Sequence, residues 1–235
     1  MKKIIAILLA VMMLLSVVGC TTEGNNNSDS TETNETPSTN TGNNNTNDDQ
    51  TITTVTESVV RSHKVADDSL FTYSDVAGGV RITAYKGTDD IVVIPNELSG
   101  KSVVAVDALL FGNNSKVRGV LLPESVTELI GTFTNNTSIE VVICEGVEIV
   151  GDNTFNSCTS LHTVILGDKL KELGNSAFFS CTKLKELYIA PSLTEINSDY
   201  ATTVFFWCDE LTIYGVSGSY IEGFCSNNNI AFKVK

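Results

Sequence analysis

The sequence predicts a β-rich (α/β) solenoid built from stacked copies of one unit, with short parallel strands and short helical turns. Two stretches 23 residues apart, FNSCTSLHTVIL at 155–166 and FFSCTKLKELYI at 178–189, carry Phe, Ser, Cys, Thr and Leu at matching positions. Five phenylalanines are each followed six residues later by an aliphatic residue, and these aliphatic positions recur in steps of 22, 22, 23 and 27 residues. A fixed period of this length is the signature of a repeat architecture.

Residues 1–19 are predicted to be a secretory signal peptide. A basic start, Met1 to Lys3, precedes an apolar run from Ile4 to Leu15 that is too short to span a bilayer. The run ends in VVGC at 17–20, which resembles the lipobox of bacterial lipoproteins, with Val17 in place of the commoner leucine. The resemblance implies that Cys20 is lipidated and becomes the first residue of the mature chain. Ordinary signal cleavage beside an incidental cysteine is the alternative.

Residues 20–69 are predicted to be a disordered, acidic tether. The stretch from Thr21 to Gln50 consists mainly of Asn, Thr, Ser, Gly and acidic residues and contains no large apolar side chain. It therefore has nothing to bury against the entropy of ordering. We expect it to continue loosely to Ser69, with a root-mean-square reach of about 35–42 Å. A protein that stands off a membrane needs such a tether.

Residues 70–235 are predicted to form the solenoid. The segment 71–84 alternates around Gly78 and Gly79, so we expect a hairpin that caps the first edge of the sheet. From each aliphatic position, further apolar residues follow at +3 and +5, and the unit reads L-x-x-V-x-L before a turn. One unit cannot cover its own apolar face, but stacked copies bury a continuous core. Periods of roughly 20–29 residues with this pattern belong to leucine-rich repeats.

More narrowly, the units resemble the BspA-like leucine-rich repeats of bacterial surface proteins. SAFFSC at 176–181 is closest to the family pattern, and the segments 82–95 and 211–232 look like its terminal units. The four matching units span 117–139, 139–161, 161–184 and 184–211. The resemblance implies a solenoid outside the cell, in a family that consists mostly of adhesins and uncharacterised surface proteins.

The sequence departs from that pattern at two places. Asn136 stands where later units have cysteine. The unit that begins at Leu184 carries four extra residues, which we expect to bulge from the turn side without breaking the sheet.

Three cysteines, Cys158, Cys181 and Cys208, share one repeat position three residues after the phenylalanine, and Cys144 stands where neighbouring units have leucine or isoleucine. A residue that replaces leucine acts as a small hydrophobe, which favours buried free thiols. A disulfide between adjacent coils is the second interpretation, since export would permit it. A metal site is the third, although one residue per coil makes a line rather than a tetrahedron. Cys225 in the terminal unit has no evident partner.

Composition excludes several function classes. The net charge is −13 and no basic stripe is present, which argues against nucleic-acid binding. The two histidines, His63 and His162, lack a neighbouring catalytic motif, and the acidic residues are scattered over turns. We therefore expect no enzyme, no cofactor and no metal.

The candidate binding residues lie between the inward positions of the predicted strands, on the open face of the sheet. We call them the face row: Val93, Leu121, Ile143, Ile165 and Tyr188 at +4, with Val141, Thr163 and Glu186 at +2. An exposed apolar row favours a partner, although β-branched residues also simply suit strands. The predicted function is a lipid-anchored, adhesin-like module on the extracellular face of the bacterial membrane that binds a protein or glycan. The alternative is a cell-envelope spacer or a self-associating solenoid.

Overall fold

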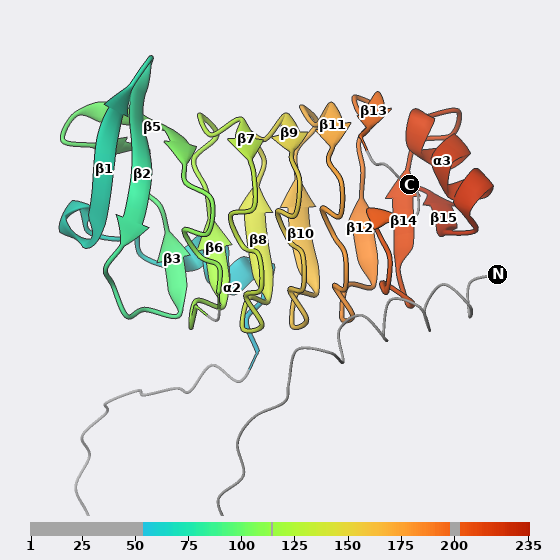
Figure 1. The fold of residues 1–235 in the computed structure, drawn as a ribbon, viewed down its shortest axis with the longest axis horizontal. Helices are drawn as coiled ribbons and strands as arrows, with labels where there is room; N and C mark the ends of the chain where they lie inside the picture. Colours follow the sequence, from blue (N-terminus) through green and yellow to red (C-terminus); the bar gives the residue numbers. More distant parts are fainter. Residues whose placement is uncertain (1–53, 114, 198–202) are drawn as a thin grey trace, which may run out of the picture. The chain divides into compact units, whose positions relative to one another are not determined.

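The computed structural model describes residues 54–113, 115–197 and 203–235, and these residues form a β solenoid (Figure 1). Each repeat contributes a strand of three or four residues to one side, a two-residue strand to a second side, and a turn segment that carries the repeated phenylalanine. The predicted fold of parallel strands in stacked repeats is confirmed.

The longer strands form a parallel sheet whose inward residues are in register, for example Val120, Val142 and Val164. Its strands, in spatial order, are β3 (Ile91–Val93), β6 (Gly119–Leu121), β8 (Val141–Cys144) and β10 (Thr163–Leu166). The shorter strands form a second parallel sheet of β7 (Glu128–Leu129), β9 (Ile149–Val150), β11 (Glu172–Leu173) and β13 (Glu195–Ile196).

The first sheet is interrupted after β10. The strands that follow make a separate parallel sheet of β12 (Glu186–Tyr188), β14 (Thr212–Gly215) and β15 (Ala231–Val234). β12 lies next to β10 in the stack but is hydrogen-bonded to β14. α3 (Tyr220–Asn228) packs on β14 and β15 at this end. The four-residue insertion lies partly outside the described residues, and β12 and β14 pair in register on either side of it.

The predicted hairpin is present. β1 (Phe71–Val76) and β2 (Gly79–Tyr85) pair antiparallel after the short 3-10 helix η1 (Asp68–Leu70), and Gly78 adopts a φ of 85° in the turn. β2 also pairs with β5 (Lys101–Val106), which pairs in turn with β4 (Glu97–Leu98). The hairpin therefore supplies one end of the solenoid, as its alternating pattern predicts.

The core is a column of stacked phenylalanines. Phe133, Phe155 and Phe178 are fully buried, and their ring centroids lie 5.2 and 5.0 Å apart with interplanar angles of 11° and 19°. Phe111 and Phe205 continue the stack at its two ends. The turn segments consist of successive i→i+3 hydrogen bonds, such as Cys158 N–H to Phe155 O and Leu161 N–H to Cys158 O. These correspond to the predicted helical turns.

The repeated cysteines join neighbouring coils without a covalent bond. The thiols of Cys158, Cys181 and Cys208 each donate to the carbonyl of the phenylalanine one coil earlier, at 3.2, 3.0 and 3.0 Å. Asn136 makes the same contact with its Nδ2, 2.8 Å from Phe111 O. The exceptional asparagine and the cysteines therefore have one shared role, which is to satisfy a buried carbonyl.

All five described cysteines are buried free thiols. Burial raises the pKa of Cys144 and Cys158 to about 12 and that of Cys225 to about 11, and it also raises the pKa of Cys181. Thiols with such pKa values are almost entirely protonated at neutral pH and are poor nucleophiles.

The predicted tether overlaps a structured segment. Residues 54–66 contain a helix, α2 (Glu57–Ser62), and Val65 forms a parallel bridge with Val93 at the edge of β3. The expectation that the tether extends to Ser69 is therefore wrong for these residues, because Val55 and Val60 find apolar surface to bury against. The predicted signal peptide, Cys20 and residues 21–53 of the predicted tether lie outside the described residues, whereas residues 67–69 lie at the start of η1.

Candidate functional site

The structure divides the face row into a covered half and an open half. Segment 54–66, which we call the strap, lies over β3, β6 and β8. Val93, Val141 and Ile143 are 7, 0 and 1% exposed, and Leu121 is half-buried against the same cluster. The expectation that these four residues form part of an open surface is wrong, because the strap fills the space above them.

The strap is held first by a small apolar cluster that is separate from the main core. Val55 and Val60 of the strap are fully buried against Ile91, Val141 and Ile143. Thr56 caps α2 through its Oγ1, which accepts from the Val59 N–H. Burying apolar side chains in this way stabilises docking by about 1.5–3 kcal/mol for each fully buried valine, before the cost of ordering the segment.

Gly119 makes room for the strap. It occupies the +2 position of β6, where the neighbouring strands carry Ile91 and Val141. A Cβ at residue 119 would lie 2.8 Å from Val60 Cγ2 and 3.1 Å from Val55 Cγ1. A side chain at this position would therefore collide with the docked strap, so docking depends on glycine at residue 119.

Two carboxylates of the sheet hold the strap by polar contacts. Glu145 accepts two hydrogen bonds from the Arg61 guanidinium, at 2.8 and 3.2 Å. Glu140 accepts from the Val55 N–H at 3.0 Å and from Arg118 Nε at 2.8 Å. Hydrogen bonding to Arg61 lowers the pKa of Glu145. Burial raises the pKa of Glu140, but the hydrogen bonds from Val55 and Arg118 outweigh it, so the net shift is downward.

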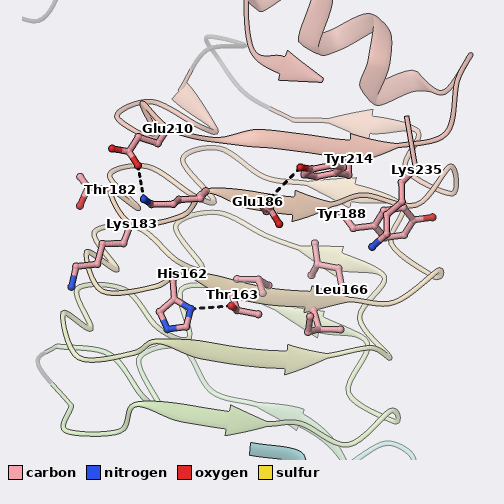
Figure 2. Close-up of a pocket in the computed structure, with 13 residues that line it drawn as sticks. His162, Thr163, Leu166, Thr182, Lys183, Glu186, Tyr188, Glu210, Tyr214 and Lys235 are labelled. Atoms are coloured by element: carbon pink, nitrogen blue, oxygen red, sulfur yellow. Dashed lines mark hydrogen bonds and ion pairs between the residues drawn. The ribbon is translucent and has the colours of Figure 1, made fainter. Parts of the chain in front are cut away.

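The open half of the face row lines a groove of about 830 Å³ over β10, β12 and β14. Thr163, Ile165, Glu186 and Tyr188 of the predicted row all line it. Figure 2 shows their side chains beside residues that the sequence did not single out for binding. These additional lining residues include Thr182, Lys183, Lys185, Glu210, Tyr214 and Lys235.

The groove has a defined polar pattern. Tyr214 donates to Glu186 Oε1 at 3.1 Å, and the two residues come from neighbouring strands (Figure 2). Lys185 pairs with Glu210 at 2.9 Å, with both side chains well exposed. Lys235 lies 5.4 Å from the centre of the Tyr188 ring, and Lys233 lies 5.7 Å from that of Tyr214. These are cation–π distances, and such contacts hold the ammonium groups beside the aromatic surface.

His162 connects the groove with the strap. Its Nδ1 lies 2.9 Å from Thr163 Oγ1 in the groove, and its Nε2 lies 3.7 Å from Glu140 Oε2. The same carboxylate oxygen accepts from the Val55 N–H of the strap. The groove and the strap are therefore neighbours that share one carboxylate.

The groove carries several groups that are common at recognition surfaces. Within 54–113, 115–197 and 203–235, no cluster of three or more His, Cys, Asp or Glu side chains could hold a metal ion. The aromatic rings, lysines, hydroxyls and the half-buried Ile165 are groups that proteins use to bind partners.

Stacked coils, a continuous phenylalanine core and an open strand face define a leucine-rich repeat protein, a class of general interaction scaffolds. The family model for the BspA type leucine rich repeat region matches six copies over residues 93–213. The chain belongs to this family, whose members are usually bacterial surface proteins.

Two solved structures share the fold. The leucine-rich repeat protein of T. pallidum is 27% identical with a TM-score of 0.60, and the match covers 64% of this chain and 71% of that one. A leucine-rich repeat protein from Bacteroides ovatus is 24% identical with a TM-score of 0.52, and the match covers 64% of this chain and 46% of that one. No curated protein matches the chain. None of the helices in the described residues has the length and apolar character needed to cross a membrane.

Proposed function

We propose that the chain is a lipid-anchored, surface-displayed binding module of the adhesin kind, which recognises an extracellular partner through the groove over β10, β12 and β14. The observation that carries this proposal is the asymmetry of the sheet face. The strap covers the face over β3, β6 and β8, whereas Tyr188 and Tyr214 line the groove beside it, and Ile165 lies half-buried between the strap cluster and the groove. Leucine-rich solenoids bind with the surface that their stacked strands present, so the open half is the surface available for a partner.

The proposal is tested by screening the labelled full chain against arrays of extracellular-matrix proteins and glycans. The double variant Ile165→Glu/Tyr188→Glu should abolish binding to any partner that the screen finds, because interface centres reject unpaired charge. Ile130→Glu is the matched control, since Ile130 is an exposed apolar residue outside the groove, 49% accessible.

Two outcomes would count against this proposal. Binding that survives the double variant would place recognition elsewhere on the solenoid. Concentration-dependent sedimentation of the wild type that the double variant removes, without any array partner, would instead favour self-association. Tyr188→Ala is a milder variant that addresses the same surface if the double variant does not fold.

Cys20 supplies the proposed membrane attachment, and Cys20→Ser tests it. Because the lipid would be the only stable anchor, we expect the variant to be released or left unprocessed. Fractionation of wild-type and variant chains from intact cells measures this. A variant that remains with the membrane to the same extent as the wild type would exclude lipid anchoring.

A further inference from the structure

The groove gathers the positive charge of an otherwise acidic part of the chain. The four lysines Lys183, Lys185, Lys233 and Lys235 are the only Lys or Arg residues after residue 171, and the whole chain has a net charge of −13. Three of them line the groove, and Lys233 lies over the ring of Tyr214, which also lines it. Residues about 50 positions apart in the sequence thus converge on one surface.

The lysines flank the groove from two ends. Lys183 lies at one end and Lys235 at the other, with Glu186 and Tyr188 between them (Figure 2). Between these lysines lies the acidic side chain of Glu186. Its carboxylate accepts a hydrogen bond from the Tyr214 hydroxyl.

The lysines are available to an incoming partner. Among the described residues, Lys183 and Lys235 form no ion pair with an acidic side chain. Lys185 and Glu210 are 68 and 65% exposed, and an ion pair this exposed to water is weak, so a ligand carboxylate can replace Glu210.

Resting on the proposed function, we infer that the partner is a protein that presents an acidic segment, with carboxylates on either side of apolar or hydroxyl side chains. The outer carboxylates pair with the lysines at the two ends. The central side chains meet Ile165, Thr163 and the Tyr188 ring. A uniformly anionic polysaccharide fits less well, because it would bring negative charge onto Glu186.

An NMR titration of the full chain with the synthetic peptide DDTVDD tests this inference. We expect shifts at Thr163, Tyr188 and Tyr214 at low salt that weaken as the salt rises through about 0.3 M, since exposed charge pairs are screened. The peptide NNTVNN, which has the same length and no carboxylates in its side chains, should bind roughly tenfold more weakly.

Charge-neutral variants identify the lysines responsible. The triple variant K183Q/K185Q/K235Q should weaken DDTVDD binding roughly tenfold, because three weak exposed charge pairs are lost together. The matched triple variant K101Q/K169Q/K171Q removes the same charge from lysines outside the groove and should bind like the wild type. Equal losses of DDTVDD affinity in both triple variants would show that only the net charge of the chain matters, and would overturn the inference.

Other outcomes separate this inference from the proposed function. No binding of DDTVDD at low salt would overturn the acidic partner. Stronger, lysine-dependent binding of polygalacturonate than of DDTVDD would assign the groove to a glycan instead. An array partner that requires Ile165 and Tyr188 but binds K183Q/K185Q/K235Q normally would leave the groove as the recognition surface and exclude an acidic ligand. An array partner that binds both Ile165→Glu/Tyr188→Glu and K183Q/K185Q/K235Q as tightly as the wild type would refute the proposed function itself.

Discussion

Gly119→Val should release the strap while leaving the repeat stack intact. A Cβ at this position already lies 2.8 Å from Val60 Cγ2 and 3.1 Å from Val55 Cγ1, and valine adds two methyl groups beyond it. Overpacking of this kind costs about 1–3 kcal/mol, and here the cost falls only on the docked state. The equilibrium between docked and released strap should therefore shift by roughly 5- to 150-fold towards release.

The repeats themselves should respond in the opposite direction. Gly119 is part of strand β6 and does not adopt a positive φ, so valine fits its backbone. Replacing a strand glycine by a β-branched residue stabilises the strand by up to about 1 kcal/mol. We expect an unchanged or slightly higher melting temperature of the solenoid together with a less protected strap.

Hydrogen exchange of residues 54–66, followed by mass spectrometry alongside calorimetric melting, measures both effects. The double variant Gly119→Val/Val60→Ala is the control, since removing Val60 Cγ2 relieves the shorter contact and should restore part of the protection. Unchanged exchange in the strap would refute the proposed steric conflict. A large drop in the melting temperature would show that the strap and the repeats unfold as one unit.

The remaining predictions concern the core, the thiols and pH. Phe155→Ala should destabilise the fold by about 3–5 kcal/mol, because it removes a fully buried ring stacked on both sides, whereas Thr159→Ala should change stability by less than about 0.5 kcal/mol; equal shifts in chemical denaturation would contradict the repeat register. The five buried thiols should react with a thiol reagent only in denaturant and without prior reduction, and labelling that requires reductant would contradict their free state. The pKa values of Glu140 and Glu145 are lowered when the strap is docked, so their charged forms stabilise docking above the ordinary pKa of 4.5, and this contribution is lost as the pH falls below it. Hydrogen exchange in residues 54–66 should therefore rise in acid before the repeats unfold. Exchange that stays constant down to global unfolding would contradict the role of these carboxylates.

The repeat register could be predicted because each coil buries side chains at the same positions. A phenylalanine and the aliphatic residue six positions later must both point inward in every coil, so the period in sequence reports the period in space. The equivalence of Asn136 with the cysteines was not predictable from hydrophobicity. It depends on hydrogen bonding to a carbonyl of the preceding coil, which asparagine and cysteine can both provide.

The strap was missed because its signals are local and short. Thr56 as a cap, Glu57 paired with Arg61 one turn later, and two valines in six residues make a helix that gains stability only from the surface beneath it. Gly119 was a visible exception among the +2 residues of the strands, but its significance required knowing what lies above it. From composition alone, residues 54–66 were therefore predicted to be part of the polar tether that precedes them.

Tyr214 was missed for a different reason, which is a shift of register in the last coil. Counting three residues from Leu211, as in the preceding units, reaches Tyr214, which would then point inward. In the structure Leu187 aligns with Ile213, and Tyr214 aligns with Tyr188 on the open face. The lysines of β15 and its end were also unpredictable as site residues, since only the pairing of β14 with β15 brings them to the groove.

The position of the proposed recognition surface follows from how the two halves of the sheet face are covered. On the side of the groove, the strap contacts Glu140, whose carboxylate accepts from the Val55 N–H and lies 3.7 Å from His162. The groove begins at that same histidine, through its contact with Thr163. Any partner that extends from the groove towards β8 must therefore meet the strap, and the area it can contact is limited by that segment and not by the number of repeats. If the strap opens, the covered residues Val141 and Ile143 would extend this surface with apolar area.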